Sequence, residues 1–262
     1  MNLEQQLKTL EKFGERYERE HLNGIDVDSM RADWFCALGF FLDHIYFQGR
    51  RGTLSEQFKK EAMSTLEAVF GSDQETRTSK FREAINVGII PTDCQWKTWT
   101  DNPLFLDLRR RKAGKRRDIE MVLDSLRFLT SCRDFNYNIV TYSISEVESG
   151  RIGDLYRRLD GIRQVGQKVA SFYLRDLITC YHLKVSEDDY SLVQPLDTWV
   201  LKVATALGVC GDRDDSTIAI EKILQVCKQF GVDPKRFNSG AWYLGAYSFK
   251  IVIERLQDGR SL

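Results

Sequence analysis

Hydrophobic residues recur at helical spacing along almost the whole chain. Leu3, Leu7, Leu10 and Tyr17 are separated by three, four and seven positions within a polar segment, which predicts an amphipathic first helix. The segment 34–47 is more apolar and predicts a buried central helix. Apolar faces of the same spacing predict further helices at 79–87, 118–129, 152–159, 169–181 and 198–207.

Small polar residues and glycines predict where helices begin and end. Ser29 is a candidate cap for the central helix, and Thr53 or Ser55 for a helix that stops at Gly71, because their hydroxyls can accept hydrogen bonds from a first turn. The segment 93–107 predicts no regular element. The best β-strand signal is the short run 139–142.

These patterns favour an all-α fold, a two-lobed helical bundle of about ten helices with a cleft between the lobes. Residues 1–262 are long enough to bury the core of one such unit. The sequence shows neither a leader nor an apolar run of membrane-spanning length. We therefore expect an intracellular monomer that contacts no membrane.

Net charge argues against a dedicated nucleic-acid binder. The 38 Lys and Arg residues balance 38 Asp and Glu residues, whereas many such binders are strongly basic. Affinity for DNA would have to come from local clusters, since phosphate contacts depend on nearby cations. The densest cluster is the run Arg109–Arg117, a composition that is equally typical of a solvated face.

The spacing of the cysteines and histidines does not support a metal site. The six cysteines are scattered and form no CxxC pair, whereas structural zinc sites and iron–sulfur clusters need closely spaced thiolates. The three histidines are also far apart. We expect no metal, no iron–sulfur cluster and no cofactor. Cys36 and Cys180 have apolar neighbours and are expected to be reduced core residues.

A helix–turn–helix segment spans residues 152–182. Its two apolar helical faces are separated by the turn 160–166. Gly166 directly precedes the second helix, where a missing side chain lets backbone N–H groups approach an anion. Lys168 lies in the first turn of that helix. A turn of this kind can bind a DNA phosphate without reading the base sequence.

The run 162–170 resembles the Leu-Pro-Gly-Val-Gly-x-Lys-x-Ala hairpin of the helix-hairpin-helix DNA glycosylase superfamily. Gly166, Lys168 and Ala170 are retained, whereas Arg163 and Gln164 replace the proline and the first glycine. The resemblance implies that double-stranded DNA is the partner. The residues expected to contact it are Gln164, Val165, Gly166 and Gln167.

The segment 194–200, Gln-Pro-Leu-Asp-Thr-Trp-Val, is similar to the family's Val-Asp-Thr-His segment and aligns Asp197 with the catalytic aspartate. The long spacing between Lys168 and Asp197 is most similar to the archaeal 8-oxoguanine glycosylase branch. The resemblance implies that the enzyme flips a damaged base from DNA and cleaves its N-glycosidic bond. Lys168, expected to be partly buried, would attack the sugar and form a Schiff base that supports AP lyase activity.

Candidates for the base pocket are aromatic or amide residues, because flipped bases are held by stacking and by edge hydrogen bonds. They are Gln48, Trp96 or Trp99, Asn238 and Trp242. Asn238 stands where the oxidised-guanine branch has an acidic residue. For Trp242 core packing is an alternative role, and for Gln48 that of a polar loop residue.

Several readings stay open beside excision of oxidised guanine. The target could be a methylated or bulky modified cytosine, which pocket changes alone would allow. A non-catalytic DNA-binding module would use Lys168 as a phosphate contact and Asp197 as the N-cap of the helix that follows. An α-helical interaction scaffold would fit the neutral net charge.

Overall fold

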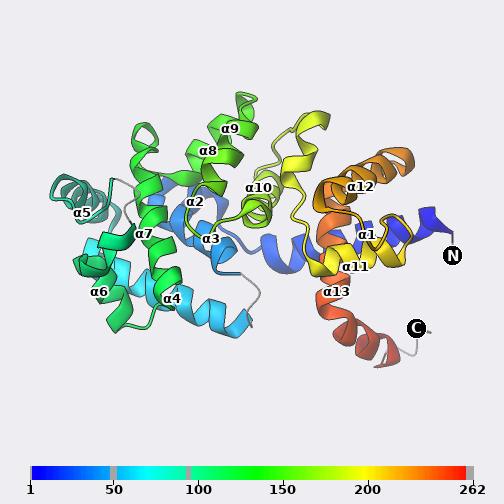
Figure 1. Cartoon of the computed structure of the whole chain (residues 1–262), viewed down its shortest axis with the longest axis horizontal. Helices are drawn as coiled ribbons and strands as arrows, with labels where there is room; N and C mark the ends of the chain where they lie inside the picture. Colours follow the sequence, from blue (N-terminus) through cyan, green and yellow to red (C-terminus); the bar gives the residue numbers. More distant parts are fainter. Residues whose placement is uncertain (1, 48–51, 93–95, 258–262) are drawn as a thin grey trace. The chain divides into compact units, whose positions relative to one another are not determined.

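The computed structural model describes residues 2–47, 52–92 and 96–257, without the side chains of 96–98, 249, 250 and 252–257. All regular structure in these residues is helical (Figure 1), which confirms the predicted all-α class. None of the described helices is both long and apolar enough to cross a membrane. The chain divides into unit 1, Met1–Ile25 with Leu174–Leu262, and unit 2, Asp26–Tyr173. Helix α10 (Gln167–Cys180) begins in unit 2 and ends in unit 1.

Unit 1 is built on two closely packed helices, α1 and α13. A Cβ atom at Gly240 would lie 2.0 Å from the carbonyl oxygen of Leu10, and one at Gly14 would lie 2.4 Å from that of Arg236. The helices can approach this closely only because both positions lack a side chain. The elements are α1 (Leu3–Tyr17), the π-helix η1 (Glu18–Leu22), the 3-10 helix η4 (Glu187–Val193), α11 (Thr198–Ala206), α12 (Ser216–Phe230) and α13 (Pro234–Gln257).

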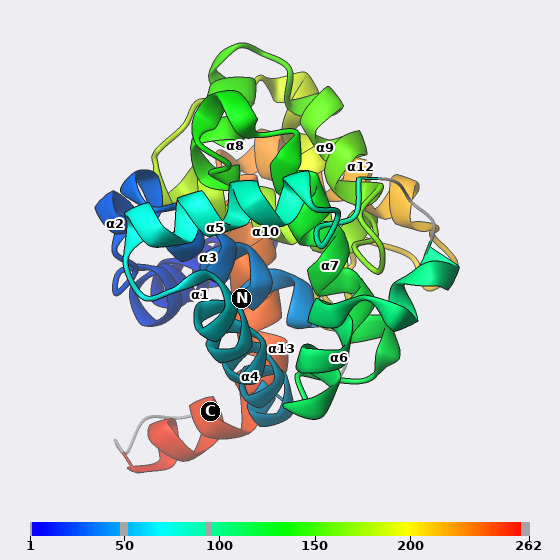
Figure 2. The same ribbon diagram turned by 90° about the vertical axis from the view of Figure 1, so that its left-hand side faces the viewer.

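Unit 2 packs around the apolar helix α3, as the sequence predicts. Trp34, Phe41 and Ile45 are at most 2% exposed, and the ring of Tyr173 lies 5.0 Å from that of Phe41. Figure 2 views this unit from the side on which α4, α5 and α6 lie. The elements are α2 (Val27–Ala32), α3 (Trp34–Tyr46), α4 (Gly52–Phe70), α5 (Gln74–Asn86), η2 (Trp96–Asp101), α6 (Pro103–Arg110), α7 (Arg116–Thr130), η3 (Arg133–Phe135), α8 (Ile139–Glu148) and α9 (Ile152–Asp160).

Two predicted helix caps are wrong. Asp33, not Ser29, caps α3, since its Oδ1 accepts from the N–H of Phe35 at 2.8 Å. Ser29 lies inside α2. Neither Thr53 nor Ser55 caps α4, because this helix already begins at Gly52, and the Ser55 hydroxyl donates to the carbonyl oxygen of Tyr46.

The predicted strand signal at 139–142 is also wrong, because these residues form the first turn of α8. The Oδ1 atom of Asn138 accepts from the N–H groups of Val140 and Thr141 at 2.9 and 3.0 Å. This cap outweighs the β-propensity of the branched residues. The segment 93–107 is not wholly irregular, because Asn102 caps α6 and Pro103 occupies its first position.

The described cysteines Cys36, Cys132, Cys180, Cys210 and Cys227 are free thiols. Cys36 is exposed and Cys180 is half-buried, so the prediction that Cys36 belongs to the core is wrong. It lies in the first turn of α3, on the side of the helix that faces away from the core. Burial raises the pKa of Cys132, Cys180 and Cys227 to about 12.

Candidate functional site

The segment between α9 and α10 is a tight turn with one left-handed residue. The carbonyl oxygen of Ile162 accepts from the N–H of Val165 at 2.9 Å, which closes a four-residue turn. Gln164, the third residue, has a φ of 64°, as a type II turn requires. Gln164 therefore adopts the backbone conformation that glycine favours.

Arg163 anchors this turn to α7. Its backbone N–H donates to Oδ2 of Asp124 at 2.6 Å, and its Nε donates to Oε2 of Glu120 at the same distance. Glu120 is 1% exposed and Asp124 is fully buried, and burial raises the pKa of the Asp124 carboxyl. The sequence motif alone did not assign Arg163 a role. The two acidic residues lie four positions apart on one face of a predicted helix, and this spacing could have indicated a partner for a basic side chain.

The start of α10 leaves Lys168 at the surface. The carbonyl oxygen of Gly166 accepts from the N–H groups of Val169 and Ala170 at 2.9 and 3.0 Å. A Cβ atom at Gly166 would meet no heavy atom within 4 Å, so an anion can approach this backbone. Lys168 is exposed rather than partly buried as expected.

The four residues expected to contact DNA differ in their exposure. Gln164, Gly166 and Gln167 are exposed. Val165 has a side chain that is 2% exposed, and its N–H already donates within the turn. DNA contacts at this turn would therefore come from the other three residues and from Lys168.

Asp197 is the N-cap of α11, the alternative role predicted for it from the sequence. Its Oδ1 accepts from the N–H groups of Trp199 and Val200, both at 2.9 Å. In the described part of the chain no group donates a hydrogen bond to Oδ2. One carboxylate oxygen is thus fixed by the helix, whereas the other is available to a ligand.

Helix α13 holds the Asp197 segment on both sides. Asn238 is fully buried, and its Nδ2 donates to the carbonyl oxygen of Pro195 at 3.2 Å. Downstream, a Cβ atom at Gly245 would lie 2.7 Å from Cβ of Trp199. Asn238 was expected in a base pocket, whereas its observed contacts are those of a residue that positions the segment before Asp197.

A buried polar network continues from Asn238. Nη1 of Arg175 donates to Oδ1 of Asn238, and Nε donates to Oδ1 of Asp176, both at 2.9 Å. The hydroxyl of Tyr17 donates to Oδ2 of Asp176 at 2.6 Å. Burial, followed by the charge of Asp176, raises the pKa of Tyr17 well above its usual range. These side chains bond to one another and link α1, α10 and α13 to the Asp197 segment.

The remaining pocket candidates are not brought together by described contacts. Trp242 is half-buried and packs edge-on against Tyr17 at 5.7 Å, as the core-packing alternative predicts. Trp99 is 3% exposed and belongs to unit 2. Gln48 lies outside the described residues, and Trp96 begins η2 without a described side chain.

Lys168 belongs to unit 2 and Asp197 to unit 1. Within unit 2, the turn and the start of α10 bring Lys168 next to Gly166 and Gln167. Within unit 1, α13 brings Asn238 to the segment that carries Asp197.

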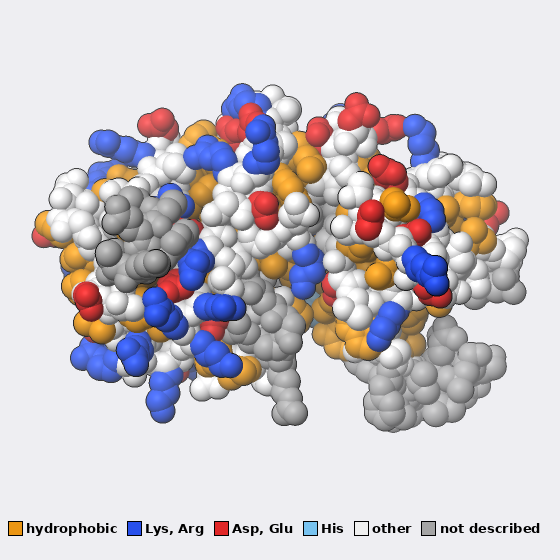
Figure 3. Space-filling view, viewed as in Figure 1, with side chains coloured by type: hydrophobic (Ala, Val, Ile, Leu, Met, Phe, Trp, Pro, Cys, Tyr) orange, Lys and Arg blue, Asp and Glu red, His pale blue; other side chains and the backbone are white. Residues whose placement is uncertain are grey.

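The basic run lies at the end of α6 and the start of α7. All of its Lys and Arg side chains are exposed, and Figure 3 shows basic side chains gathered over this part of the surface. Arg110 pairs with Asp107 at 2.7 Å, and Arg116 pairs with Glu120 at 2.8 Å. The other cations have no ion pair within the described residues: Arg109, Arg111, Lys112, Lys115 and Arg117.

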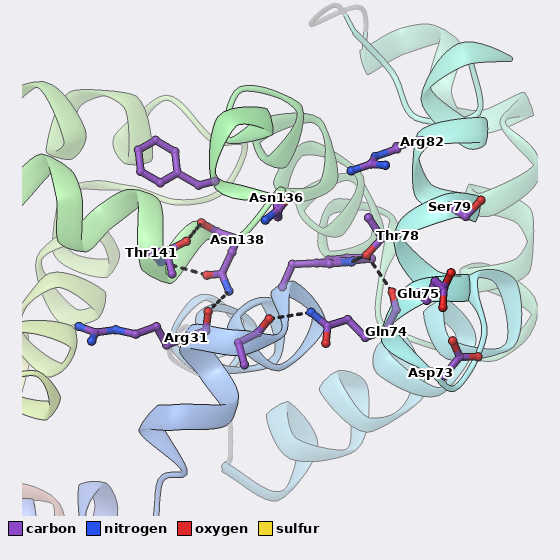
Figure 4. Close-up of a pocket in the computed structure, with 13 residues that line it drawn as sticks. Arg31, Asp73, Gln74, Glu75, Thr78, Ser79, Arg82, Asn136, Asn138 and Thr141 are labelled. Atoms are coloured by element: carbon purple, nitrogen blue, oxygen red, sulfur yellow. Dashed lines mark hydrogen bonds between the residues drawn. The ribbon is translucent and has the colours of Figure 1, made fainter.

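A polar hollow of about 970 Å³ in unit 2 involves neither the turn nor the Asp197 segment. It lies between α2, α5 and the residues before α8 (Figure 4). Two of its amides are bonded to the protein itself, since Asn138 donates to the carbonyl oxygen of Met30 and Gln74 to that of Ala32. The sequence did not reveal this hollow, because its walls come from segments that are far apart along the chain.

Comparisons with known proteins assign neither a family nor an activity. No protein-family model matches the chain, and no solved structure matches it. An uncharacterized protein of Methanocaldococcus jannaschii is 30% identical over 101 residues, which cover 38% of this chain and 23% of that protein. The match thus spans less than a quarter of that relative's length.

Proposed function

We propose that the protein is a DNA glycosylase with an associated AP lyase activity. The observation that carries the proposal is the turn before α10, which combines the left-handed Gln164, the open backbone at Gly166 and the exposed Lys168. An anion bound there would meet the N-terminus of a helix and a cation together. A DNA phosphate has this chemistry, and an amine held beside it lies within reach of the adjoining sugar.

In the proposed reaction, Lys168 is the nucleophile. Its neutral amine attacks C1′ of the deoxyribose of a flipped nucleotide, and the electron pair of the N-glycosidic bond leaves with the base, which takes up a proton. The C1′–O4′ bond then breaks, its electron pair leaves on O4′, and O4′ takes up the second proton from nitrogen, which opens the sugar ring and gives a Schiff base between Nζ and C1′. Removal of a C2′ proton then expels the 3′ phosphate and nicks the strand.

Asp197 would act on the sugar through its second carboxylate oxygen. As base departure begins, positive charge develops on C1′ and the ring oxygen. A fixed carboxylate stabilises this charge without having to reorganise. The hydrogen bonds from Trp199 and Val200 to Oδ1 hold the group in place and leave Oδ2 to face the substrate.

Base release and borohydride trapping on a panel of duplexes test the proposal. The panel carries 8-oxoguanine, oxidised pyrimidines, an abasic site and modified cytosines, so that it also separates oxidised guanine from the cytosine alternative. We expect a covalent adduct with the wild type and none with Lys168→Gln. Lys184→Gln, which changes another exposed lysine, is the matched control and should keep the adduct.

A non-catalytic DNA-binding module is the second candidate. It is favoured by the N-cap role of Asp197, which accounts for this residue without catalysis. This candidate predicts tight binding to duplex DNA, with neither base release nor an adduct on any member of the panel. A scaffold without DNA affinity would bind none of the duplexes.

A further inference from the structure

Trp199 is an exposed aromatic residue at the start of α11. It is 42% exposed, although tryptophan is highly buried on average. The other tryptophans with described side chains, Trp34, Trp99 and Trp242, are buried or half-buried. An exposed indole two residues from Asp197 is therefore a distinctive feature of this surface.

Trp199 is held at its backbone and at its side chain. The backbone N–H of Trp199 donates to the Oδ1 atom of Asp197 at 2.9 Å. A Cβ atom at Gly245 of α13 would lie 2.7 Å from Cβ, 2.9 Å from Cε3 and 3.0 Å from Cγ of Trp199. The Trp199 side chain thus packs against the backbone of α13 at Gly245. Any residue with a Cβ atom at position 245 would displace the indole.

A cation accompanies the exposed ring. Nζ of Lys202, one turn further along α11, lies 5.2 Å from the centroid of the Trp199 ring. Lys202 is exposed and has no ion pair within the part of the chain that the structure describes. Ile218 on α12 is equally exposed at 42%, but it has neither a π face nor a described cation beside it.

A fixed π face beside a mobile cation suits a nucleotide. Bases stack on aromatic side chains whatever their identity, and a nearby ammonium can pair with the phosphate. The flexible four-carbon stem of Lys202 lets its ammonium leave the ring for such a phosphate. Only an unpaired base can offer its face to the indole, because paired bases in a duplex are stacked on their neighbours.

We propose that Trp199 and Lys202 bind one unpaired nucleotide of DNA, with the base on the indole and the phosphate on the ammonium. The choice of DNA as partner rests on the proposed function. Because Asp197 holds the N–H of Trp199, the bound nucleotide lies next to the carboxylate. The platform would thereby favour duplexes that already contain an unpaired base.

The test compares two labelled duplexes that differ by a single bulged thymidine. Fluorescence anisotropy should show that the wild type binds the bulged duplex more tightly. Trp199→Leu should weaken that binding about tenfold, the size expected for one lost base–aromatic stack, and change affinity for the paired duplex less than twofold. Lys202→Gln should weaken binding to the bulged duplex less than Trp199→Leu does. It should also lower the slope of log affinity against log salt concentration by the amount expected for one phosphate contact.

Two further variants keep the test independent of protein stability. Gly245→Ala should displace the indole without removing it, and so reproduce the loss caused by Trp199→Leu. Ile218→Ala changes a residue of equal exposure and should leave both affinities unchanged. Circular dichroism melting verifies that each variant folds.

Three results would overturn the proposal: no preference of the wild type for the bulged duplex, equal losses on both duplexes, or no DNA binding at all. Base release is measured separately on the same proteins. A preference that depends on Trp199 without any base release would retain the nucleotide platform and reject the glycosylase. Base release without the preference would do the reverse.

Discussion

Gln164 gives the sharpest test of the turn that presents Lys168. With a φ of 64°, the residue occupies the left-handed region, which costs a residue with a Cβ atom about 1–2 kcal/mol. Glycine removes this cost but adds about 0.4–1 kcal/mol of unfolded-state entropy. We therefore expect Gln164→Gly to increase the free energy of unfolding by about 0.5 kcal/mol.

For other residues at position 164, the change in stability should depend on how well each residue tolerates a positive φ. Asn tolerates positive φ better than most residues, so Gln164→Asn should be close to neutral. Valine is branched at Cβ and is a genuine outlier at positive φ, so Gln164→Val should cost about 1–2 kcal/mol. At about 2–4 °C per kcal/mol, Gly should raise the Tm by about 1–2 °C and Val should lower it by about 2–8 °C.

Urea unfolding measures these differences, and Gln167→Gly is the matched control. Gln167 is an exposed glutamine three residues further on, but it lies in the first turn of α10. Glycine in a helix costs about 0.5–1 kcal/mol, so this control should lose stability where Gln164→Gly gains it. Changes of the same sign at both positions would refute the left-handed turn, and with it the geometry on which the proposed function depends.

Asp197→Asn should keep the N-cap and change the free energy of unfolding by less than about 0.5 kcal/mol, while the rate of base release falls at least tenfold. Loss of stability with an unchanged rate of base release would leave Asp197 only its capping role. Simultaneous replacement of Arg109, Arg111 and Lys112 by glutamine should weaken binding to all duplexes alike. It should also lower the slope of log affinity against log salt concentration by about 2.7, as measured by fluorescence anisotropy at several salt concentrations. An unchanged slope would mean that the basic run lies away from the DNA. A thiol reagent at pH 8 should modify Cys36 in the folded protein, because Cys36 is exposed; titration of Cys36→Ser should show one fast-reacting thiol fewer, and an unchanged count would contradict its exposure.

Stability should also depend on pH through the buried thiols. The pKa of Cys132 is about 12 in the folded protein, against about 8.5 for an unperturbed thiol. The folded state therefore retains the proton that the unfolded state loses, and the free energy of unfolding should fall as the pH rises from about 8.5 towards 12. Cys132→Ala should make this decline shallower in urea unfolding at several pH values, and an unchanged slope would contradict the assignment.

Helical periodicity was sufficient to predict the fold class, because the apolar faces of α1, α3, α7, α9 and α10 are continuous in sequence. Where prediction failed, a specific side chain outweighed the local pattern. Asn138 caps α8 through its Oδ1 and turns a run with β-propensity into a helix, and the Nδ2 of the same side chain donates to the carbonyl oxygen of Met30. That contact joins residues 108 positions apart, so no local window contains it.

In the candidate site, too, local features could be predicted from the sequence and long-range contacts could not. The order of Gly166, Lys168 and Asp197 was visible in the sequence, as was the capping role open to Asp197. The contacts that position these residues were not, because Arg163 contacts α7 and Asn238 contacts Pro195 through pairs that are 39 to 43 residues apart. Long-range hydrogen bonds of this kind leave no periodic signal.

Location of the covalent adduct tests the central claim most directly. The wild-type protein is incubated with a duplex that contains an abasic site, reduced with borohydride and digested, and the modified peptide is sequenced by mass spectrometry. The account predicts a reduced Schiff base on Nζ of Lys168, absent from Lys168→Gln. An adduct on another lysine, or none with a protein that binds the duplex, would contradict it.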